Sequence, residues 1–450
     1  MPNCLSWCPA SLVGMPLTVV LAEPLGVRAG RSEGKRSSHG RKIRGRRILK
    51  DGHCATISPV RLLKLNAGGH LPLRAAVARG QAVSDGRSDH TIKARGKCMS
   101  YEIDFLPVGE GSGDAIVIRY GDGGTNNWLH VVDGGSTGTA KTIIEHIEKY
   151  YPGYYINNMV LSHADNDHAA GLVGVMERFR VDHLWMNRPW LYADQILHHF
   201  HGNFTLQGLI NDIKVRHPYL VELEDLALSK GTQIHDVFQG QEIGKFTVLA
   251  PTRERYINSI PDFGKTPDRK TTAATDSGGF PFLKALLEQG KKLLEDWNIE
   301  TLATNTVTSA SNESSVVQYA ALDGDTVLLT ADVGPLGLTE AADYGAARGL
   351  SRATRIQVPH HGSRHNVTPA VLDRWLGPKL PHDAYVGTAI CSVGSTKTDY
   401  PRAQVINAFM RRGFKVYSTR TKWISWYQGG GHPNSSPAQA EVFADEVEGV

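Results

Sequence analysis

Three apolar runs that lie far apart in this chain each end in residues of the types that bind metal ions. Met159-Val160-Leu161 leads toward the stretch HADNDH at 163–168, TVLLTA leads into Asp332, and RIQVP leads into His360 and His361. A short apolar run bounded by turn signals is typical of a buried strand. We therefore expect three strand ends of one layered α/β fold to bring these side chains into one cavity.

The HADNDH stretch places four ligand-type side chains in six positions: His163, Asp165, Asp167 and His168. On a helix, Asp165 would point away from the face shared by His163 and Asp167, and on a strand His168 would oppose the other three. A strand-to-helix loop would let His163 and Asp165 converge on one ion while Asp167 and His168 converge on a neighbouring ion. Helix capping explains a single aspartate here, but it does not explain four such residues.

Asp332 and the pair His360-His361 complete the set of candidate ligands. Taken alone, Asp332 also fits a strand-ending turn, and the histidine pair also fits a solvated loop. Together with HADNDH, however, all three strand ends carry ligand-type residues. The combination predicts one metal site in which the Asp332 carboxylate bridges two ions.

The rest of residues 99–430 alternates β-rich runs with helical patterns. Residues 139–151 have helical spacing of their isoleucines, and β-rich runs precede them and return from 315 onward. The segment 190–310 looks like a partly helical insertion, with helical patterns at 206–214 and 282–297. Residues 431–450 form a C-terminal tail. This organisation predicts an α/β domain.

Residues 1–98 differ in composition from the rest of the chain. They hold 18 Lys and Arg against 5 Asp and Glu, whereas residues 99–450 hold 31 against 40, a net charge of −9. We interpret 1–98 as disordered, or as sequence upstream of a translation start at Met99. A basic nucleic-acid-binding tail is the alternative, and a signal peptide is disfavoured because the positive n-region is missing.

The cysteines and the apolar runs bear on the protein's location. Four of the five cysteines fall in the first 98 residues, and Cys391 is the one that follows. A single cysteine in the main body favours a reducing cytoplasm. No apolar run reaches the roughly 18 to 20 residues of a membrane helix, so we expect no membrane partner.

The ordered combination of HADNDHAAGL, VVDGG, VLLTADV and VPHHGS resembles the metallo-β-lactamase superfamily, and within it the hydrolase domain of ComEC-type competence proteins. The resemblance covers about 99–189 and 311–425. It implies an αββα metallo-β-lactamase-like sandwich with two metals at one edge between the sheets. It also implies a ligand set: His163 and Asp165 on one metal, Asp167 and His168 on the other, Asp332 between them, and His360 or His361 closing the second position.

Departures from the family pattern bear on the first metal position. Asp165 stands where the usual HxHxDH loop has its second histidine, and SNESSVVQYAA (311–321) occupies the place of a third histidine. Near the end of the resemblance, the expected His-Pro pair reads Tyr400-Pro401. The first position is therefore poor in ligands. The carboxylate-rich set suits both zinc and manganese; zinc is our first choice and manganese the alternative.

This reading predicts a metal-dependent hydrolase. Two divalent ions roughly 3.5 to 4 Å apart lower the pKa of a shared water and hold a bridging hydroxide as the nucleophile. Asp167 is expected to orient it, and His361, or whichever of His360 and His361 is not a ligand, to protonate the leaving group. Ser311 is expected to lie near the site but outside the ligand shell.

By family analogy, the substrate is a phosphodiester or a related phosphoryl ester, either nucleotide-type or nucleic acid. A hydrolase of a carboxylic ester or lactone is an alternative, and so is a non-catalytic or regulatory metal-binding module on the same fold. A P-loop NTPase is disfavoured, because Ala140 stands where the pattern GxxxxGK[ST] requires glycine. That interpretation would also leave HADNDH and VPHHGS unexplained.

Overall fold

The computed structural model describes residues 100–122, 126–200, 204–264, 292–429, 431–432 and 435–449. The chain divides into two units, Met1–Ser88 and Asp89–Val450, and every described residue belongs to the second. The predictions for residues 1–98 therefore lie outside the described residues. So does most of the helical pattern at 282–297, of which residues 292–294 form a strand, β9.

The first sheet has seven strands in the order β15-β1-β2-β3-β4-β5-β6. Pairing is antiparallel from β15 through β3 and parallel from β3 through β6. The strands are β1 (Ser100–Phe105), β2 (Ala115–Gly121), β3 (Asn127–Gly134), β4 (Ile156–Val160), β5 (Val181–Trp185), β6 (Gln233–His235) and β15 (Ile424–Gln428).

The second sheet also has seven strands, in the order β14-β13-β12-β11-β10-β8-β7. Here β14 through β11 are parallel, and β11 through β7 are antiparallel. The strands are β7 (Glu242–Ile243), β8 (Phe246–Ala250), β10 (Val317–Leu322), β11 (Asp325–Leu329), β12 (Arg355–Gln357), β13 (Gly387–Cys391) and β14 (Phe414–Ser418).

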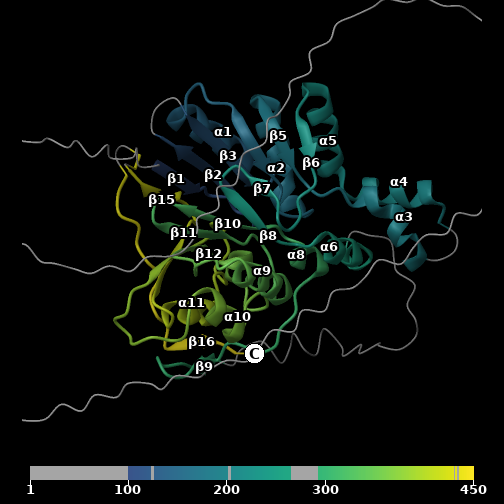
Figure 1. The fold of residues 1–450 in the computed structure, drawn as a ribbon. Coiled ribbons are helices and arrows are strands. Elements are labelled where there is room, and N and C mark those ends of the chain that lie inside the picture. The colour runs from purple at the N-terminus through teal and green to yellow at the C-terminus, as the bar shows by residue number, and fades with distance from the viewer. Residues whose placement is uncertain are drawn as a thin grey trace, which may run out of the picture. The chain divides into compact units, whose positions relative to one another are not determined.

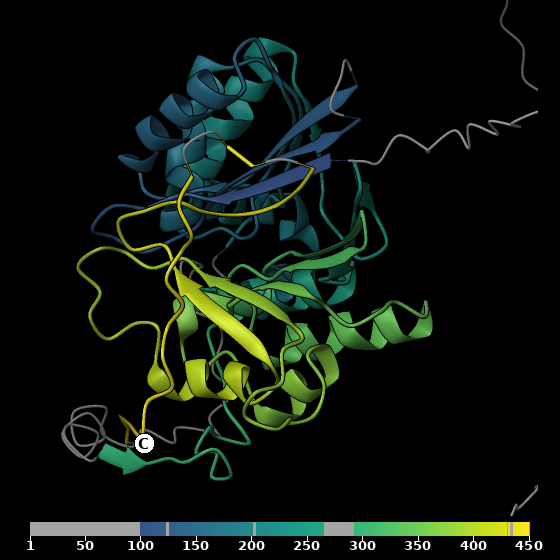
Figure 2. The ribbon, with the colours of Figure 1, turned by 90° about the vertical axis from the view of Figure 1, so that its left-hand side faces the viewer.

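Helices cover the outer face of each sheet (Figure 1). The first sheet is covered by α1 (Thr139–Tyr150), α2 (Asn166–Arg178) and α5 (Pro218–Lys230), and the second by α9 (Pro335–Ala347), α10 (Pro369–Trp375) and α11 (Ala403–Met410). Figure 2 shows the same layers from the side.

The alternation of strand side chains explains these layers. On β2, Ala115 and Val117 pack with the helices, whereas Ile116 and Ile118 belong to the apolar cluster between the sheets. This is the period of two expected for a strand buried on both faces. Helix, sheet, sheet and helix thus form the αββα sandwich that was predicted, and the predicted strands and the helix at 139–151 are present.

The segment 190–310 is partly helical, as predicted, but it is not wholly an addition to the sandwich. It supplies β6 to the first sheet and both β7 and β8 to the second. The apolar run FTVLA forms β8 because it pairs with β10, and its short length hid this strand among helical patterns. The short helices in the described part of this segment are η1 (Pro189–Tyr192), α3 (Ala193–Ile196), η2 (Leu197–His199), α4 (Leu206–Arg216), α6 (Arg253–Ser259), η3 (Ile260–Asp262) and α8 (Ala310–Glu313).

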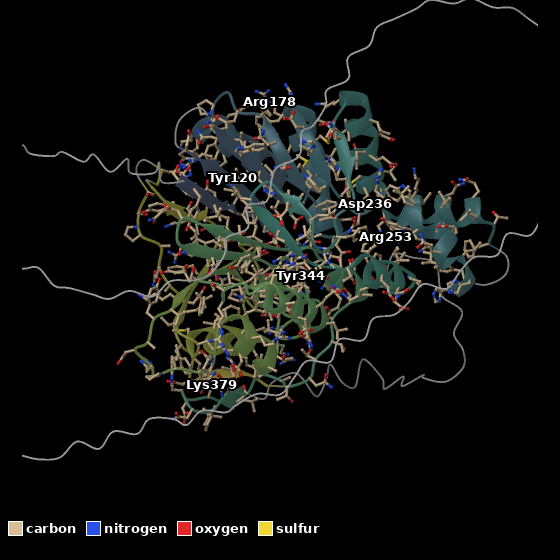
Figure 3. The ribbon with its side chains drawn as sticks, viewed as in Figure 1. Tyr120, Arg178, Asp236, Arg253, Tyr344 and Lys379 are labelled. Atoms are coloured by element: carbon tan, nitrogen blue, oxygen red, sulfur yellow. The ribbon has the colours of Figure 1, made fainter. Side chains whose placement is uncertain are left out.

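A polar cluster joins these short helices to the sandwich on the side from which α3 and α4 extend, where Asp236 and Arg253 lie (Figure 3). The Tyr192 hydroxyl donates to Asp236 Oδ2 at 2.9 Å, and the Arg253 guanidinium lies 5.1 Å from the centre of the Tyr192 ring. These contacts link the strand end after β6 with η1 and the first residue of α6.

The tail also contributes structure. β16 (Glu446–Glu448) pairs antiparallel with β9 (Lys292–Leu294), outside the two large sheets. Among the described residues, no helix combines the length and the apolar character needed to cross a membrane.

Candidate metal centre

The HADNDH residues span the junction between a strand and a helix. β4 ends at Val160 and α2 begins at Asn166, so His163 and Asp165 lie in the loop while Asp167 and His168 open the helix. Asp165 occupies the N-cap position with an extended backbone, but its side chain makes no capping hydrogen bond. Capping therefore does not account for this aspartate.

The second sheet supplies the other candidate ligands from two neighbouring parallel strands. Asp332 follows the end of β11, and His360 and His361 follow β12 in the short helix η4 (Pro359–Gly362). Adjacent parallel strands end at the same edge of a sheet, which places these loops side by side.

The Asp332 carboxylate lies at the centre of four imidazoles. Its Oδ2 is 3.4 Å from His168 Nε2, 3.5 Å from His360 Nε2 and 4.0 Å from His163 Nε2. Its Oδ1 is 3.8 Å from His361 Nε2. Two of these histidines come from the first sheet and two from the second. The Asp332 carboxylate thus lies close to histidines from both halves of the sandwich.

The remaining ligand candidates fall on two sides of Asp332. His361 groups with Asp167 and His168, with ligand atoms all within 4.8 Å of one another. Asp165 Oδ2 lies 3.6 Å from His163 Nε2. The structure therefore brings together all seven predicted residues and places His361 beside Asp167 and His168, whereas His163 groups with both His168 and Asp332.

Unpaired polar atoms show that the arrangement fits metal ions. Among the described residues, the buried atoms His163 Nε2, His168 Nε2 and Asp332 Oδ1 have no hydrogen-bond partner. An unpaired buried polar group costs about 1 to 3 kcal/mol, and such groups are rare in native proteins. Imidazole and carboxylate lone pairs that converge in this way are the donors that zinc and similar divalent ions take.

Asp133 holds the loop and one ligand in place. It accepts from the Ser162 backbone N–H at 2.8 Å and from the Ser162 hydroxyl at 2.6 Å, and its Oδ2 lies 2.8 Å from His168 Nδ1. Since a carboxylate accepts, it favours a proton on His168 Nδ1 and orients the ring with Nε2 toward Asp332. Sequence reasoning assigned no role to Asp133, although it ends the apolar strand in VVDGG.

The two histidines of η4 are oriented through their Nδ1 atoms. His361 Nδ1 lies 3.0 Å from the Ser392 carbonyl oxygen, which can only accept, so this nitrogen carries the proton. Its Nε2 accepts from the Gly113 backbone N–H at 3.2 Å. His360 Nδ1 lies 2.9 Å from Asn366 Oδ1. Both rings therefore turn Nε2 toward Asp332.

Backbone strain is concentrated at this centre. Asp133, Ala331, His360 and His361 have positive φ values of 56°, 46°, 45° and 55°. Non-glycine residues adopt this region only where the surrounding structure holds them, and such residues cluster at functional sites. The strained turns aim the carboxylate and imidazole groups inward.

The centre is strongly coupled electrostatically. Burial would raise the pKa of Asp332, but the charges of His360, His361 and His168 hold it well below its usual value. Burial would lower the pKa of His168, but Asp332 and Asp133 raise it well above its usual value. The site therefore carries opposite charges that a bound cation would rearrange.

Two further residues near the centre were also missed. Buried Asp114 lies at the start of β2, 3.9 Å from His168 Nδ1, and burial raises its pKa. The Ser112 hydroxyl donates to Asp167 Oδ2 at 2.7 Å. Both lie in the stretch FLPVGEGSGDAIVIRYG, in the turn between β1 and β2. Ser311 lies near the candidate ligands, and its hydroxyl donates to Asp165 Oδ1 at 2.9 Å.

Two cavities adjoin the centre. One of about 180 Å³ is lined by Ser112, His360, His361, Val393, Gly394, Lys397 and Tyr400. The other, of about 330 Å³, is lined by Asp165, Asn166, Asp167, His217, Phe263, Gly264, Ser309 and Ser311. A larger hollow of about 650 Å³ on α4 and α5 contains none of the candidate ligands. A reactant can thus approach the ligands from two sides.

Comparisons with solved structures find metallo-β-lactamase folds. The metallo-beta-lactamase fold protein YhfI from Bacillus subtilis is 11% identical, with 73% of this chain and 100% of that chain covered and a TM-score of 0.34. A metallo-beta-lactamase from Cronobacter sakazakii is 13% identical; the match covers 56% of this chain and 76% of that one, with a TM-score of 0.25. AidC, a dizinc quorum-quenching lactonase, is 11% identical; the match covers 49% of this chain and 56% of that one, with a TM-score of 0.23. No protein-family model matches the chain, and no curated protein matches it.

Proposed function

We propose that this protein is a metal-dependent hydrolase of phosphoryl esters, with phosphodiesters as the preferred class. The observation that carries the proposal is the Asp332 carboxylate among four imidazoles, two of which leave a buried Nε2 without a hydrogen-bond partner. When bound, two divalent ions would activate a water and neutralise charge in the transition state. Zinc is our first choice and manganese the alternative.

The ligand set that we propose has two parts that share Asp332. His163 and Asp165 would hold one ion, and Asp167, His168 and His361 the other. His361 is assigned here because it groups with Asp167 and His168. This assignment changes the role that the sequence favoured for His361, and it leaves His360 as the catalytic histidine.

Asp167 and His360 would carry the proton transfers. The Ser112 hydroxyl fixes one oxygen of Asp167, so the carboxylate is set to orient the attacking water. Attack on phosphorus breaks the bond to the leaving-group oxygen, which then takes a proton. His360 lines the smaller cavity and faces Asp332 through Nε2, and protonated at that atom it would supply the proton.

Lys397 supports an anionic substrate. It lines the smaller cavity together with His360, His361 and Tyr400, so it brings a positive charge to the wall of this cavity. A phosphodiester carries the negative charge that this lysine and the metals would attract, whereas a lactone or simple ester does not. The net charge of −9 over residues 99–450 favours a small diester or short oligonucleotide over a long polyanion.

We also propose a cytoplasmic setting and a relationship to the ComEC-type hydrolase domain. Cys391 is buried with a free thiol, and it is the one cysteine among the described residues. A fold of this size that relies on no disulfide suits a reducing compartment.

A substrate panel tests the proposal. Wild-type protein loaded with zinc or manganese would be assayed with bis(4-nitrophenyl) phosphate, 4-nitrophenyl phosphate, a short oligonucleotide, 4-nitrophenyl acetate and an acyl-homoserine lactone. We expect the phosphodiesters to be turned over fastest. Turnover of only the acetate or lactone would assign the alternative hydrolase class. Full metal loading without turnover of any of them would favour a non-catalytic module.

A further inference from the structure

A second His–Asp cluster lies on the outer face of the first sheet and shares no residue with the candidate metal centre. Its acid is Asp104 on β1, whose neighbours Ile103 and Phe105 face the core between the sheets. By alternation, Asp104 faces the helix side, where it meets His146 of α1. The third member, His432, follows β15 near the end of the chain.

The three ligand-type atoms point at one place. His146 Nε2 and His432 Nε2 each lie 2.9 Å from Asp104 Oδ2, and the Tyr151 hydroxyl lies 2.7 Å from the same oxygen. Asp104 is fully buried, and His146 and His432 are buried as well. The Ser425 hydroxyl contacts the other carboxylate oxygen, Oδ1.

Three hydrogen-bonding groups compete for one oxygen of the Asp104 carboxylate. One carboxylate oxygen offers about two lone pairs, yet three groups approach Asp104 Oδ2. The Tyr151 hydroxyl has one proton, but it also lies 3.3 Å from Glu102 Oε2 and 3.3 Å from His432 Nε2. A bound cation would relieve this competition for Asp104 Oδ2, because both imidazoles would then present lone pairs to the cation instead of N–H groups to the carboxylate.

The spacing and the surroundings suit a closed zinc site. The ligand-type atoms of Asp104, His146 and His432 all lie within 4.8 Å of one another. The two N···O distances of 2.9 Å are hydrogen-bond distances that zinc binding would lengthen. The rings of Tyr150 and Trp423 pack against His432, with centroid distances of 4.3 and 5.0 Å. Neither cavity beside the candidate metal centre is lined by these residues.

We propose that Asp104, His146 and His432 bind a structural zinc ion, with the Tyr151 hydroxyl next to the fourth coordination position. The ligands come from β1, α1 and the segment after β15. The ion would therefore tie the C-terminal part of the domain to its first strand and first helix, so that binding contributes directly to folding stability. This site is independent of the proposed hydrolase activity.

Zinc content tests the proposal in the full-length protein. Wild type and His432→Gln would be loaded with zinc, dialysed against a weak chelator and analysed by elemental mass spectrometry. We expect the variant to hold one equivalent less zinc per chain and to keep the metals of the candidate metal centre. His382→Gln removes an exposed histidine and is the matched control, with unchanged zinc. Equal zinc content in wild type and His432→Gln would overturn the site in favour of a hydrogen-bonded network.

Cobalt spectroscopy covers the case in which His432→Gln folds poorly. In Asp167→Ala/Asp332→Ala, the candidate metal centre is disabled while Asp104, His146 and His432 are intact. We expect this double variant to bind one equivalent of Co²⁺ and to show the visible bands of a four-coordinate site with histidine ligands. A folded double variant without such bands would refute the proposal, whatever the fate of the hydrolase activity.

Discussion

The two His–Asp clusters of this protein use the same residue types in opposite settings. The candidate metal centre draws ligands from the strand ends of both sheets, with strained turns at His360 and His361 and two adjoining cavities. The Asp104 cluster lies on one sheet face, with Asp104 in a regular strand and His146 in a regular helix. Aromatic rings cover it.

This difference fits the two roles that we propose, a reactive site and a structural one. Catalytic metal sites keep a position open to substrate, whereas structural sites are closed by protein. In the candidate metal centre, buried Nε2 atoms of His163 and His168 lack hydrogen-bond partners. In the second cluster, each Nε2 already contacts Asp104. We therefore expect substitutions at the first cluster to affect turnover, and substitutions at the second to affect stability.

The largest expected effect is that of Asp167→Ala. This change removes a ligand of the second metal position and the carboxylate that would orient the attacking water. Hydrolysis of a phosphodiester should fall by several orders of magnitude, while circular dichroism shows an intact fold. Asp383→Ala, at a fully exposed aspartate, is the matched control and should match wild type. Turnover of Asp167→Ala at the wild-type rate would place the chemistry elsewhere. Ser311→Ala is unsuitable as a control because Ser311 contacts Asp165.

A smaller and more selective effect should separate the two adjacent histidines. His361→Ala should lower both the metal content and turnover, because His361 is assigned as a ligand. His360→Ala should lower kcat by about 10²- to 10⁴-fold, the usual contribution of a general acid, and leave the metal content unchanged. Metal analysis and steady-state kinetics on both variants make the comparison. Loss of metal from His360→Ala alone would reverse the two roles.

A smaller loss, of metal affinity, is expected from Asp133→Asn. The change leaves an amide near His168 Nδ1 but removes the charge that orients the ring and Ser162. Mutation of a residue that hydrogen-bonds a metal ligand typically lowers metal affinity or activity by about 10- to 100-fold. Competition with a chromogenic chelator measures that loss, and Asp133→Glu, which keeps the charge, should recover part of it. Unchanged affinity in Asp133→Asn would make this aspartate purely structural.

The smallest expected effect on turnover belongs to His432→Gln. Because the Asp104 cluster is remote from the proposed chemistry, kcat should equal the wild-type value. The melting temperature of the zinc-loaded protein should fall by several degrees, since a ligand bound only to the folded state stabilises it. Thermal unfolding with and without chelator measures this shift. A loss of turnover with unchanged melting would contradict the division between the two clusters.

Sequence reasoning located the candidate metal centre because its ligands follow apolar strands. HADNDH, Asp332 and the His360-His361 pair stand out as clusters next to such runs, and strand ends meet at one edge of a layered fold. The sequence did not predict which of His360 and His361 is the better candidate ligand, because the directions of the two rings depend on the positive φ of both residues. Asp133 carried a visible strand-end signal, but its contacts with Ser162 and His168 depend on the tertiary fold.

Other features left weaker traces in the sequence. Asp104, His146 and His432 are single residues separated by long stretches of sequence, so no local motif predicts that they lie together. The strand β8 lies among helical patterns, and only its pairing with β10 reveals its place in the second sheet. These features arise from contacts between residues far apart in the sequence, which local hydrophobic periodicity does not predict.

Metal titration tests the central claim most directly. The protein would be stripped with a chelator and titrated with zinc or manganese while phosphodiester hydrolysis and bound metal are both measured. Our account predicts no turnover in the stripped protein, and activity that rises as the candidate metal centre fills and is absent throughout in Asp332→Ala. Hydrolysis that persists in the stripped protein, or full activity in Asp332→Ala, would contradict a metal centre built around Asp332.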